Sequence, residues 1–100
     1  MVMKSTEEIL SILRTFKQNE GEKYGIEAMA LVGSTARGEQ REDSDIDICV
    51  KLRPTIDYFT LQELQEKLES IFRVKIDLIT LHENLRQLFR HNIERDAIYV

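Results

Sequence analysis

Hydrophobic residues recur at helical spacing near the start of the chain and then change to strand-like patterns. Ser5 and Glu8 have the spacing of a capping box, which predicts the start of a helix. Gly21 and Gly25 are expected to end this helix and to form a loop. The apolar face of the predicted helix consists of Ile9, Ile12, Leu13 and Phe16.

Two segments that follow are predicted to be strands. Residues 26–32 are almost wholly apolar and lie between glycines, which indicates a buried strand. Residues 45–51 alternate, so successive side chains point to opposite faces. The polar stretch 33–44 between them has room for one helical turn around Ala36. The core face of the second strand would consist of Ile46, Ile48 and Val50. Its other face would consist of Asp45, Asp47 and Cys49.

The second half of the chain is predicted to continue with a helix and a third strand. Thr60 and Glu63 have capping-box spacing, and Phe59 with Leu64 fits a hydrophobic staple. Residues 73–80 alternate again and are predicted to be a strand. The core face of that strand would consist of Val74, Ile76 and Leu78, and the opposite face would carry Lys75, Asp77 and Ile79.

A last helix and a short edge strand complete the predicted order. Residues 80–83 form a third capping box, and residues 97–100 suit an edge strand. The inward-facing residues of this predicted helix would be Leu85, Leu88, Phe89 and Ile93. We predict one α/β (α+β) domain over residues 1–100: a small mixed sheet with helices packed on one face. The second and third strands would form a parallel, right-handed βαβ unit. The first two would run antiparallel if Gly33 is to lie near Asp45.

Composition narrows the possible functions. The chain is 42% hydrophobic and 32% charged, which is typical of a globular protein. Its net charge of −4 argues against binding nucleic acid through the phosphate backbone. We find no apolar run long enough to span a bilayer and no signal peptide, so we expect no membrane association. A lone cysteine, Cys49, cannot form an internal disulfide, and a reducing cytoplasmic location is expected.

Three acids would share the face opposite the core. Asp45 and Asp47 lie two residues apart on one strand, roughly 6.5 to 7 Å from each other. Asp77 would come from the neighbouring strand of the βαβ unit. Carboxylates gathered in this way suit Mg²⁺, and two such ions support displacement at phosphorus. The alternative is that these are ordinary acids on an exposed strand face.

A glycine and a serine lie just upstream of the paired acids. Gly33 permits a sharp turn and a close approach to a ligand, and Ser34 adds a hydroxyl and an N–H that suit phosphate oxygens. Arg37 could add positive charge for a triphosphate. An ordinary turn is the alternative for the first two residues. For Arg37 the alternative is an ion pair with Glu39, Glu42 or Asp43.

Taken together, these residues resemble a known signature. Val32, the pair Gly33-Ser34, a spacer over residues 35–44 and then Asp-Ile-Asp-Ile are similar to the motif of the DNA polymerase beta-like nucleotidyltransferase superfamily. The fuller string GSTARG…DSDIDI resembles its minimal nucleotidyltransferase branch. The agreement in element order and length extends over the whole chain, although Asp77 matches by strand position alone.

The resemblance implies a fold, a reaction and a set of site residues. It implies the polymerase beta-like nucleotidyltransferase fold and a Mg²⁺-dependent enzyme with two ions in its site. The implied reaction moves a nucleoside monophosphate, AMP from ATP, to a hydroxyl group. Asp77 would also help to deprotonate that hydroxyl. The implied nucleotide-binding residues are Gly33, Ser34 and Arg37. The implied catalytic and metal-binding residues are Asp45, Asp47 and Asp77.

The resemblance also implies a protein partner. Members of the minimal branch pair with a HEPN-domain toxin, often an RNase, and silence it by adding AMP to a tyrosine. This chain would then be an antitoxin in a hetero-oligomer, with no direct nucleic-acid partner. One alternative is an antitoxin that acts mainly by occluding the toxin. A further alternative is a nucleotidyltransferase that modifies a small molecule.

Overall fold

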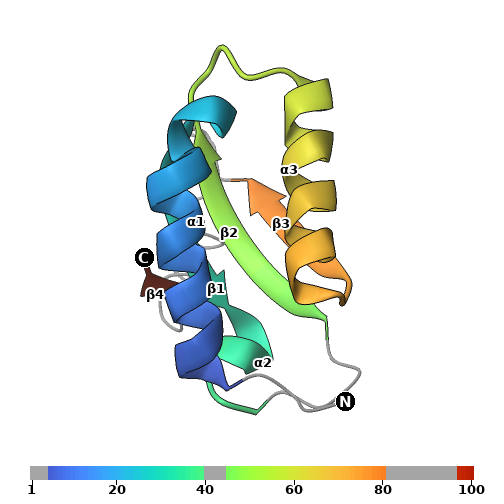
Figure 1. Ribbon diagram of the computed structural model, residues 1–100. Helices are drawn as coiled ribbons and strands as arrows, with labels where there is room; N and C mark the ends of the chain where they lie inside the picture. The colour runs from blue at the N-terminus through green and yellow to red at the C-terminus, as the bar shows by residue number, and fades with distance from the viewer. Residues whose placement is uncertain (1–4, 40–44, 81–96) are drawn as a thin grey trace, which may run out of the picture.

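The helices and strands of the described residues follow the predicted order. The structure, a computed structural model, describes residues 5–39, 45–80 and 97–100. Figure 1 shows how its elements are arranged. In chain order they are α1 (Thr6–Tyr24), β1 (Ile26–Val32), α2 (Gly33–Ala36), β2 (Ile46–Leu52), α3 (Tyr58–Phe72), β3 (Ile76–Thr80) and β4 (Ile98–Tyr99).

The sheet is mixed, as predicted. Its strand order is β3-β2-β1-β4. β1 pairs antiparallel with β2 and with β4, whereas β2 and β3 pair in parallel. β4 is the short edge strand expected near residues 97–100, and its pairing with β1 joins Ala30 to Tyr99. The connection between the parallel strands is α3, so the predicted parallel βαβ unit is present.

The main core lies between the sheet and two helices. Figure 1 shows α1 and α3 side by side over one face of the sheet. Ile48 and Val50 of β2 are fully buried there, as the alternation in the sequence predicted. The helices contribute Leu13 and Phe16 from α1 and Leu64, Leu68 and Phe72 from α3. Burying this apolar surface is the main force that holds the helices to the sheet.

The opposite face of the sheet is partly covered. Ala30, Val32 and Cys49 form a second small buried cluster there, against Ile79 and Ala97. Cys49 is only 1% exposed, so it is a packed residue of this cluster. Side chains on this face are more accessible at the end of the sheet where β2 begins: Asp47 is half-buried there and Asp77 is exposed. The acids therefore lie beside an apolar layer at the accessible end of this face.

The first helix continues beyond Gly21, where it was expected to end. Gly21 is buried within α1, and the helix ends at Gly25, whose φ of 65° lies in the left-handed region. The N–H of Gly25 donates to the carbonyls of Gly21 and Glu22 and closes the last turn. The capping box of Ser5 and Glu8 is confirmed in both directions.

The start of the second helix corrects another prediction. The N-cap is Asp57, whose carboxylate accepts from the N–H of Thr60 at 2.8 Å. The helix therefore begins at Tyr58, and Thr60 lies inside it instead of being its N-cap. The expected staple of Phe59 and Leu64 is wrong, because Phe59 is 77% exposed. Aspartate is as good an N-cap as threonine, and the earlier of two candidate caps prevails here.

The third strand is shorter than its alternating pattern predicted. Arg73 has a φ of 57° and ends α3 in the left-handed conformation, so β3 begins only at Ile76. The predicted helix that follows Thr80, with Leu85, Leu88, Phe89 and Ile93, lies outside the described residues. In the described ranges, we find no helix with the length and apolar character needed to cross a membrane.

The N-cap assignment predicts the effect of two substitutions. Thr60 lowers the pKa of Asp57 below its ordinary value, mainly through its backbone N–H. Asp57→Ala should therefore lower the Tm clearly, whereas Thr60→Ala should lower it less, because the backbone donor remains. The stabilisation by Asp57 exists above the unfolded-state pKa and should be lost as the pH falls through the lowered folded-state pKa.

Thermal unfolding between pH 2 and pH 7 measures both effects. Asp57→Asn is the matched control, since it keeps an acceptor for the helix but should lose the pH dependence. A larger loss of stability for Thr60→Ala than for Asp57→Ala would contradict the assignment.

Candidate active site

The antiparallel pairing of β1 with β2 brings the glycine turn to the acids. Val32, the last residue of β1, pairs in register with Asp47 of β2. The chain then enters the four-residue helix α2 at Gly33, which is the short helical turn predicted near Ala36. Gly33 thus lies against Asp47, fourteen positions further along the sequence. The antiparallel pairing of the first two strands, which was expected if Gly33-Ser34 is to lie near Asp45, is confirmed.

Gly33 is tightly constrained by its surroundings. Its φ is 74°, in the region where residues with a side chain are strained. A Cβ at this position would collide with the Asp47 carboxylate oxygen Oδ2 and would lie 3.3 Å from its Cγ. Both the backbone conformation and the available space therefore require glycine. Ser34 follows in α2, is half-buried, and accepts from the N–H of Glu39 through its carbonyl at 2.9 Å.

The parallel pairing of β2 with β3 brings the second acid to the same place. Asp47 and Asp77 are register partners on adjacent strands, so their backbones lie roughly 4.8 Å apart. Burial raises the pKa of Asp47, and the charge of Asp77, a hydrogen bond to it, and the charge of Asp45 raise it further. Asp45 itself is exposed and directly precedes the strand in which it was predicted. The structure therefore brings the three acids into electrostatic contact.

Two side chains of α3 fix the strand that carries Asp77. The N–H of Ile76 donates to Glu69 Oε2 at 3.2 Å. The carbonyl of Ile76 accepts from Gln65 Nε2 at 2.9 Å. These bonds hold the first residue of β3 and so position the next one, Asp77. Sequence analysis missed both residues, because nothing in a helical pattern indicates which polar side chain will reach a strand.

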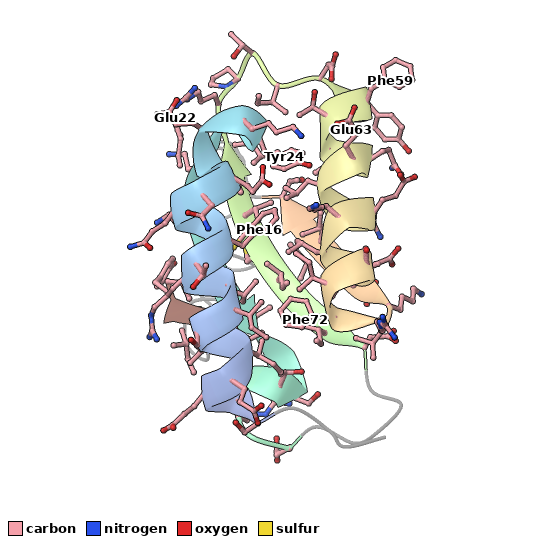
Figure 2. All side chains as sticks on the ribbon, in the orientation of Figure 1. Phe16, Glu22, Tyr24, Phe59, Glu63 and Phe72 are labelled. Carbon is pink, nitrogen blue, oxygen red and sulfur yellow. The ribbon has the colours of Figure 1, made fainter. Side chains whose placement is uncertain are left out.

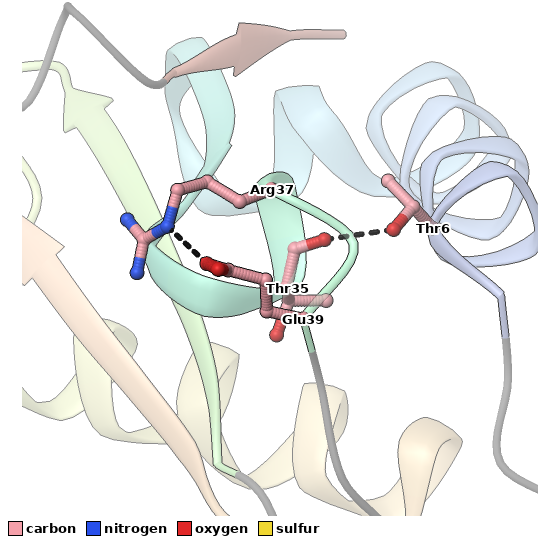
Figure 3. A network of polar contacts seen from close by, with 4 residues as sticks. All are labelled: Thr6, Thr35, Arg37 and Glu39. Carbon is pink, nitrogen blue, oxygen red and sulfur yellow. Dashed lines mark hydrogen bonds and ion pairs between the residues drawn. The ribbon is translucent and has the colours of Figure 1, made fainter.

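Arg37 follows α2 and has two roles. Its Nε lies 2.6 Å from Glu39 Oε1, and both side chains are largely exposed, so the predicted alternative of an ion pair with Glu39 is confirmed (Figure 3). Arg37 also opposes the rise in the pKa of Asp47, which shows that its charge reaches the acids. Glu42 and Asp43, the other expected partners, lie outside the described residues.

A contact between α1 and α2 also holds the turn. Thr6 Oγ1 donates to the carbonyl of Thr35 at 2.8 Å, as Figure 3 shows. Thr35 is 1% exposed, and its own hydroxyl has no hydrogen-bond partner among the described residues. Sequence analysis missed Thr6, which lies 29 positions from its partner. The two strands beside the turn and this bond from α1 together fix the position of Gly33-Ser34.

The donor set suits a cation that arrives with other ligands. Among residues 5–39, 45–80 and 97–100, no group of three or more His, Cys, Asp and Glu side chains is arranged to hold a metal ion by itself. Mg²⁺ is usually bound by one or two carboxylates, with substrate phosphates and water completing its shell. The close pair Asp47 and Asp77 matches that smaller requirement.

A mixed sheet in which a glycine turn lies against paired carboxylates is the arrangement expected of a nucleotidyltransferase. Comparison with known proteins supports the same class. The nucleotidyltransferase domain family matches residues 9–100, and the chain belongs to that family. It is therefore a nucleotidyltransferase. A candidate protein adenylyltransferase of Methanocaldococcus jannaschii is 49% identical over 78 residues, covering 78% of this chain and 91% of that protein. The protein adenylyltransferase MntA of Thermococcus cleftensis is 34% identical over 100 residues, the whole of both chains.

Solved structures agree with the fold. A candidate minimal nucleotidyltransferase superposes with a TM-score of 0.81 at 26% identity and covers 98% of both chains. A toxin–antitoxin crystal structure with AMP-PNP superposes with a TM-score of 0.63, also at 26% identity, covering 82% of this chain and 70% of that one. The resemblance to the minimal nucleotidyltransferase branch is confirmed.

The contact between Gly33 and Asp47 predicts the effect of adding a methyl group. Gly33→Ala should lower the Tm and weaken nucleotide binding by at least about tenfold, because the Cβ displaces the Asp47 carboxylate as well as straining the backbone. Gly38→Ala is the matched control: its φ is also 74°, but its Cβ would meet only Thr6 Oγ1 at 3.9 Å. It should lose stability by roughly 1–2 kcal/mol from strain and keep nucleotide binding. Equal nucleotide affinities in the two variants would contradict this account.

The raised pKa of Asp47 predicts that its ionised carboxylate destabilises the folded state. With a raised folded-state pKa, stability is greatest below the unfolded-state pKa and falls as the pH rises through the folded-state pKa. Asp47→Asn should therefore raise the Tm at pH 7 in metal-free buffer, with the difference vanishing near pH 3. Calorimetry in the presence of EDTA measures this effect. Glu27→Gln, at an exposed acid of β1, should leave the Tm nearly unchanged, and a lower Tm for Asp47→Asn at pH 7 would refute the prediction.

Proposed function

We propose that this chain transfers AMP from ATP to a tyrosine hydroxyl of a HEPN-domain toxin and thereby acts as its antitoxin. The observation that carries the proposal is the turn at Gly33 held against Asp47, which is itself in register with Asp77. A relative that matches this whole chain is named a protein adenylyltransferase. A structure of the same fold at 26% identity is a toxin–antitoxin pair with AMP-PNP.

The turn and the acids both suit the triphosphate of a nucleotide. Gly33 and Ser34 would donate backbone N–H groups to its phosphate oxygens, since no side chain caps these groups at the start of α2. Arg37, exposed beside the turn, would add positive charge to the triphosphate. This use of Arg37 requires its guanidinium to exchange the Glu39 carboxylate for phosphate oxygens.

The acids would hold Mg²⁺ once the nucleotide arrives. Asp45, Asp47 and Asp77 are the residues that would bind the ions. The pKa of Asp47 is raised by burial and then by the negative charges of Asp77 and Asp45. A cation would neutralise those charges, which supports this assignment. Bound Mg²⁺ would neutralise the phosphate oxygens and favour the departure of pyrophosphate.

The remaining chemistry belongs to the carboxylate of Asp77. The acceptor hydroxyl oxygen forms a bond to the α-phosphorus while the bond from that phosphorus to the pyrophosphate oxygen breaks. The hydroxyl proton must leave, and Asp77 is the exposed carboxylate beside Asp47 that can accept it. The products are the AMP ester of the acceptor and pyrophosphate.

A second candidate is an antitoxin that acts mainly by binding. Two adjacent aromatic residues of α3, Tyr58 and Phe59, are 67% and 77% exposed, which favours a contact surface on this chain. Binding and transfer are compatible, so the question is which of them neutralises the toxin.

Transfer of label from α-labelled ATP tests the proposed function. The assay contains this chain, Mg²⁺ and a HEPN-domain protein as the acceptor. Label should appear on a tyrosine of that protein, and Asp45→Asn with Asp47→Asn should lower the rate by several orders of magnitude. Glu27→Gln is the control and should keep the wild-type rate. Absence of transfer, or transfer that survives the double substitution, would refute the proposal.

Toxicity in cells separates catalysis from binding. The double asparagine variant should still form the complex yet fail to rescue growth if catalysis neutralises the toxin. Full rescue by that variant would instead favour the binding candidate.

A further inference from the structure

An aromatic pair lies exposed at the start of α3. Tyr58 and Phe59 are 67% and 77% exposed, and Figure 2 shows Phe59 pointing away from the molecule at the first turn of the helix. Their rings meet edge to face, with centroids 6.5 Å apart and planes at 72°. Single exposed aromatic residues are common on protein surfaces, but two adjacent large rings mark an interaction site more often. The chain has seven aromatic residues in all, so this pair is a large share of them.

The fold does not need either ring. Neither residue belongs to the buried core or to the side chains packed against it. Helix α3 is started by the carboxylate of Asp57, which would cap any residue that followed. The two rings are nevertheless held in place: Gln62 Nε2 donates to the Tyr58 hydroxyl at 2.8 Å, and Phe59 packs against the Tyr58 ring. Side chains that are ordered before binding lose less entropy in an interface.

The pair is remote from the candidate active site. β2 runs from Ile46 to Leu52, and α3 begins after the loop that follows, so the rings lie at the end of the strand opposite to Asp47. Leu52 follows Asp47 by five positions along the strand, which corresponds to roughly 17 Å. The acids also lie on the face of the sheet opposite to the helices. Substitutions at the pair therefore leave the nucleotide site untouched.

Charged residues around the pair distinguish between possible occupants. Asp57 precedes the rings, and Glu63 and Glu66 follow on the exposed part of α3, which has one basic residue, Lys67. Arg53 in the preceding loop is already paired with Glu22 at 3.2 Å. A second copy of this chain would bring the same acids and another net charge of −4, so self-association through this surface is disfavoured. A basic partner is favoured instead.

We propose that Tyr58 and Phe59, with Glu63 and Glu66, form a docking surface for the protein that accepts the nucleotide. The complementary surface of that protein carries apolar side chains surrounded by lysine or arginine. This inference rests on the proposed function, in which the acceptor is a protein. Exposed aromatic residues are the side chains that most often dominate the energy of such contacts.

Docking at this surface is independent of the chemistry at Asp47. The rings hold the partner, whereas the acids modify it. Loss of the rings should raise the KM for the protein acceptor and leave kcat at saturation and the affinity for ATP unchanged. Loss of Asp47 should abolish transfer and leave the complex intact.

A binding measurement with matched variants tests the surface. The dissociation constant for the HEPN-domain protein is measured by calorimetry for the wild type and for Tyr58→Ser with Phe59→Ser. The double variant should bind at least about tenfold more weakly, with an unchanged Tm because both rings are exposed. Tyr58→Phe with Phe59→Tyr should keep the wild-type affinity. Tyr99→Ser, at an exposed aromatic residue of β4, is the control elsewhere on the surface.

Salt dependence tests the charge of the partner. Glu63→Gln with Glu66→Gln should weaken binding and make it less sensitive to salt. Unchanged affinity in the ring variant, or an equal loss in Tyr99→Ser, would overturn the proposal. A wild-type dimer that the ring variant disperses in analytical ultracentrifugation would also overturn it, in favour of a second copy. Because this readout is binding, failure of AMP transfer would count against the proposed function alone.

Discussion

The close approach of Gly33 to the carboxylate of Asp47 is the constraint on which the candidate site depends. It fixes the chain direction at the end of β1, since only a left-handed glycine can turn the backbone there without colliding with the acid. The register of β1 against β2 places Asp47 beside this turn, and a shift of one residue would place Asp47 on the core face. The hydrophobic alternation of β2 and the glycine turn thus require the same pairing.

The same arrangement concentrates negative charge. Asp47 and Asp77 are brought together by strand pairing, and the charge of Asp45 adds to theirs. The fold tolerates this repulsion because Leu13, Ile48, Val50, Leu64 and Leu68 are completely buried on the other face of the sheet. The apolar core on one face of the sheet thus stabilises the fold, and the repulsion between the acids on the other face destabilises it. Such a loss of stability at a functional site is common in enzymes.

Much of the fold could be predicted from the sequence, because the signals were local or periodic. The alternation of Ile46, Ile48 and Val50 identified a strand with one buried face, and element order then implied the mixed sheet. Choices between equivalent local signals were less predictable: Asp57 and Thr60 are both good caps, and nothing in the pattern marks Arg73 as left-handed. The bonds from Thr6, Gln65 and Glu69 could not be predicted, since they join elements distant in sequence through side chains that are common on any helix.

The dependence of Asp77 on α3 has a consequence for the order in which the enzyme forms. Asp77 reaches the site only when β3 pairs in parallel with β2, and that pairing needs the intervening helix to dock and to hold Ile76 through Gln65 and Glu69. Parallel pairing across a crossover forms late, because the connecting chain must first be closed. A chain that has emerged from the ribosome only as far as β2 has the glycine turn and Asp47 but lacks this third acid. Under the proposed function, the acids of the site are complete only once this parallel pairing has formed, and the repulsion between them arises at the same step.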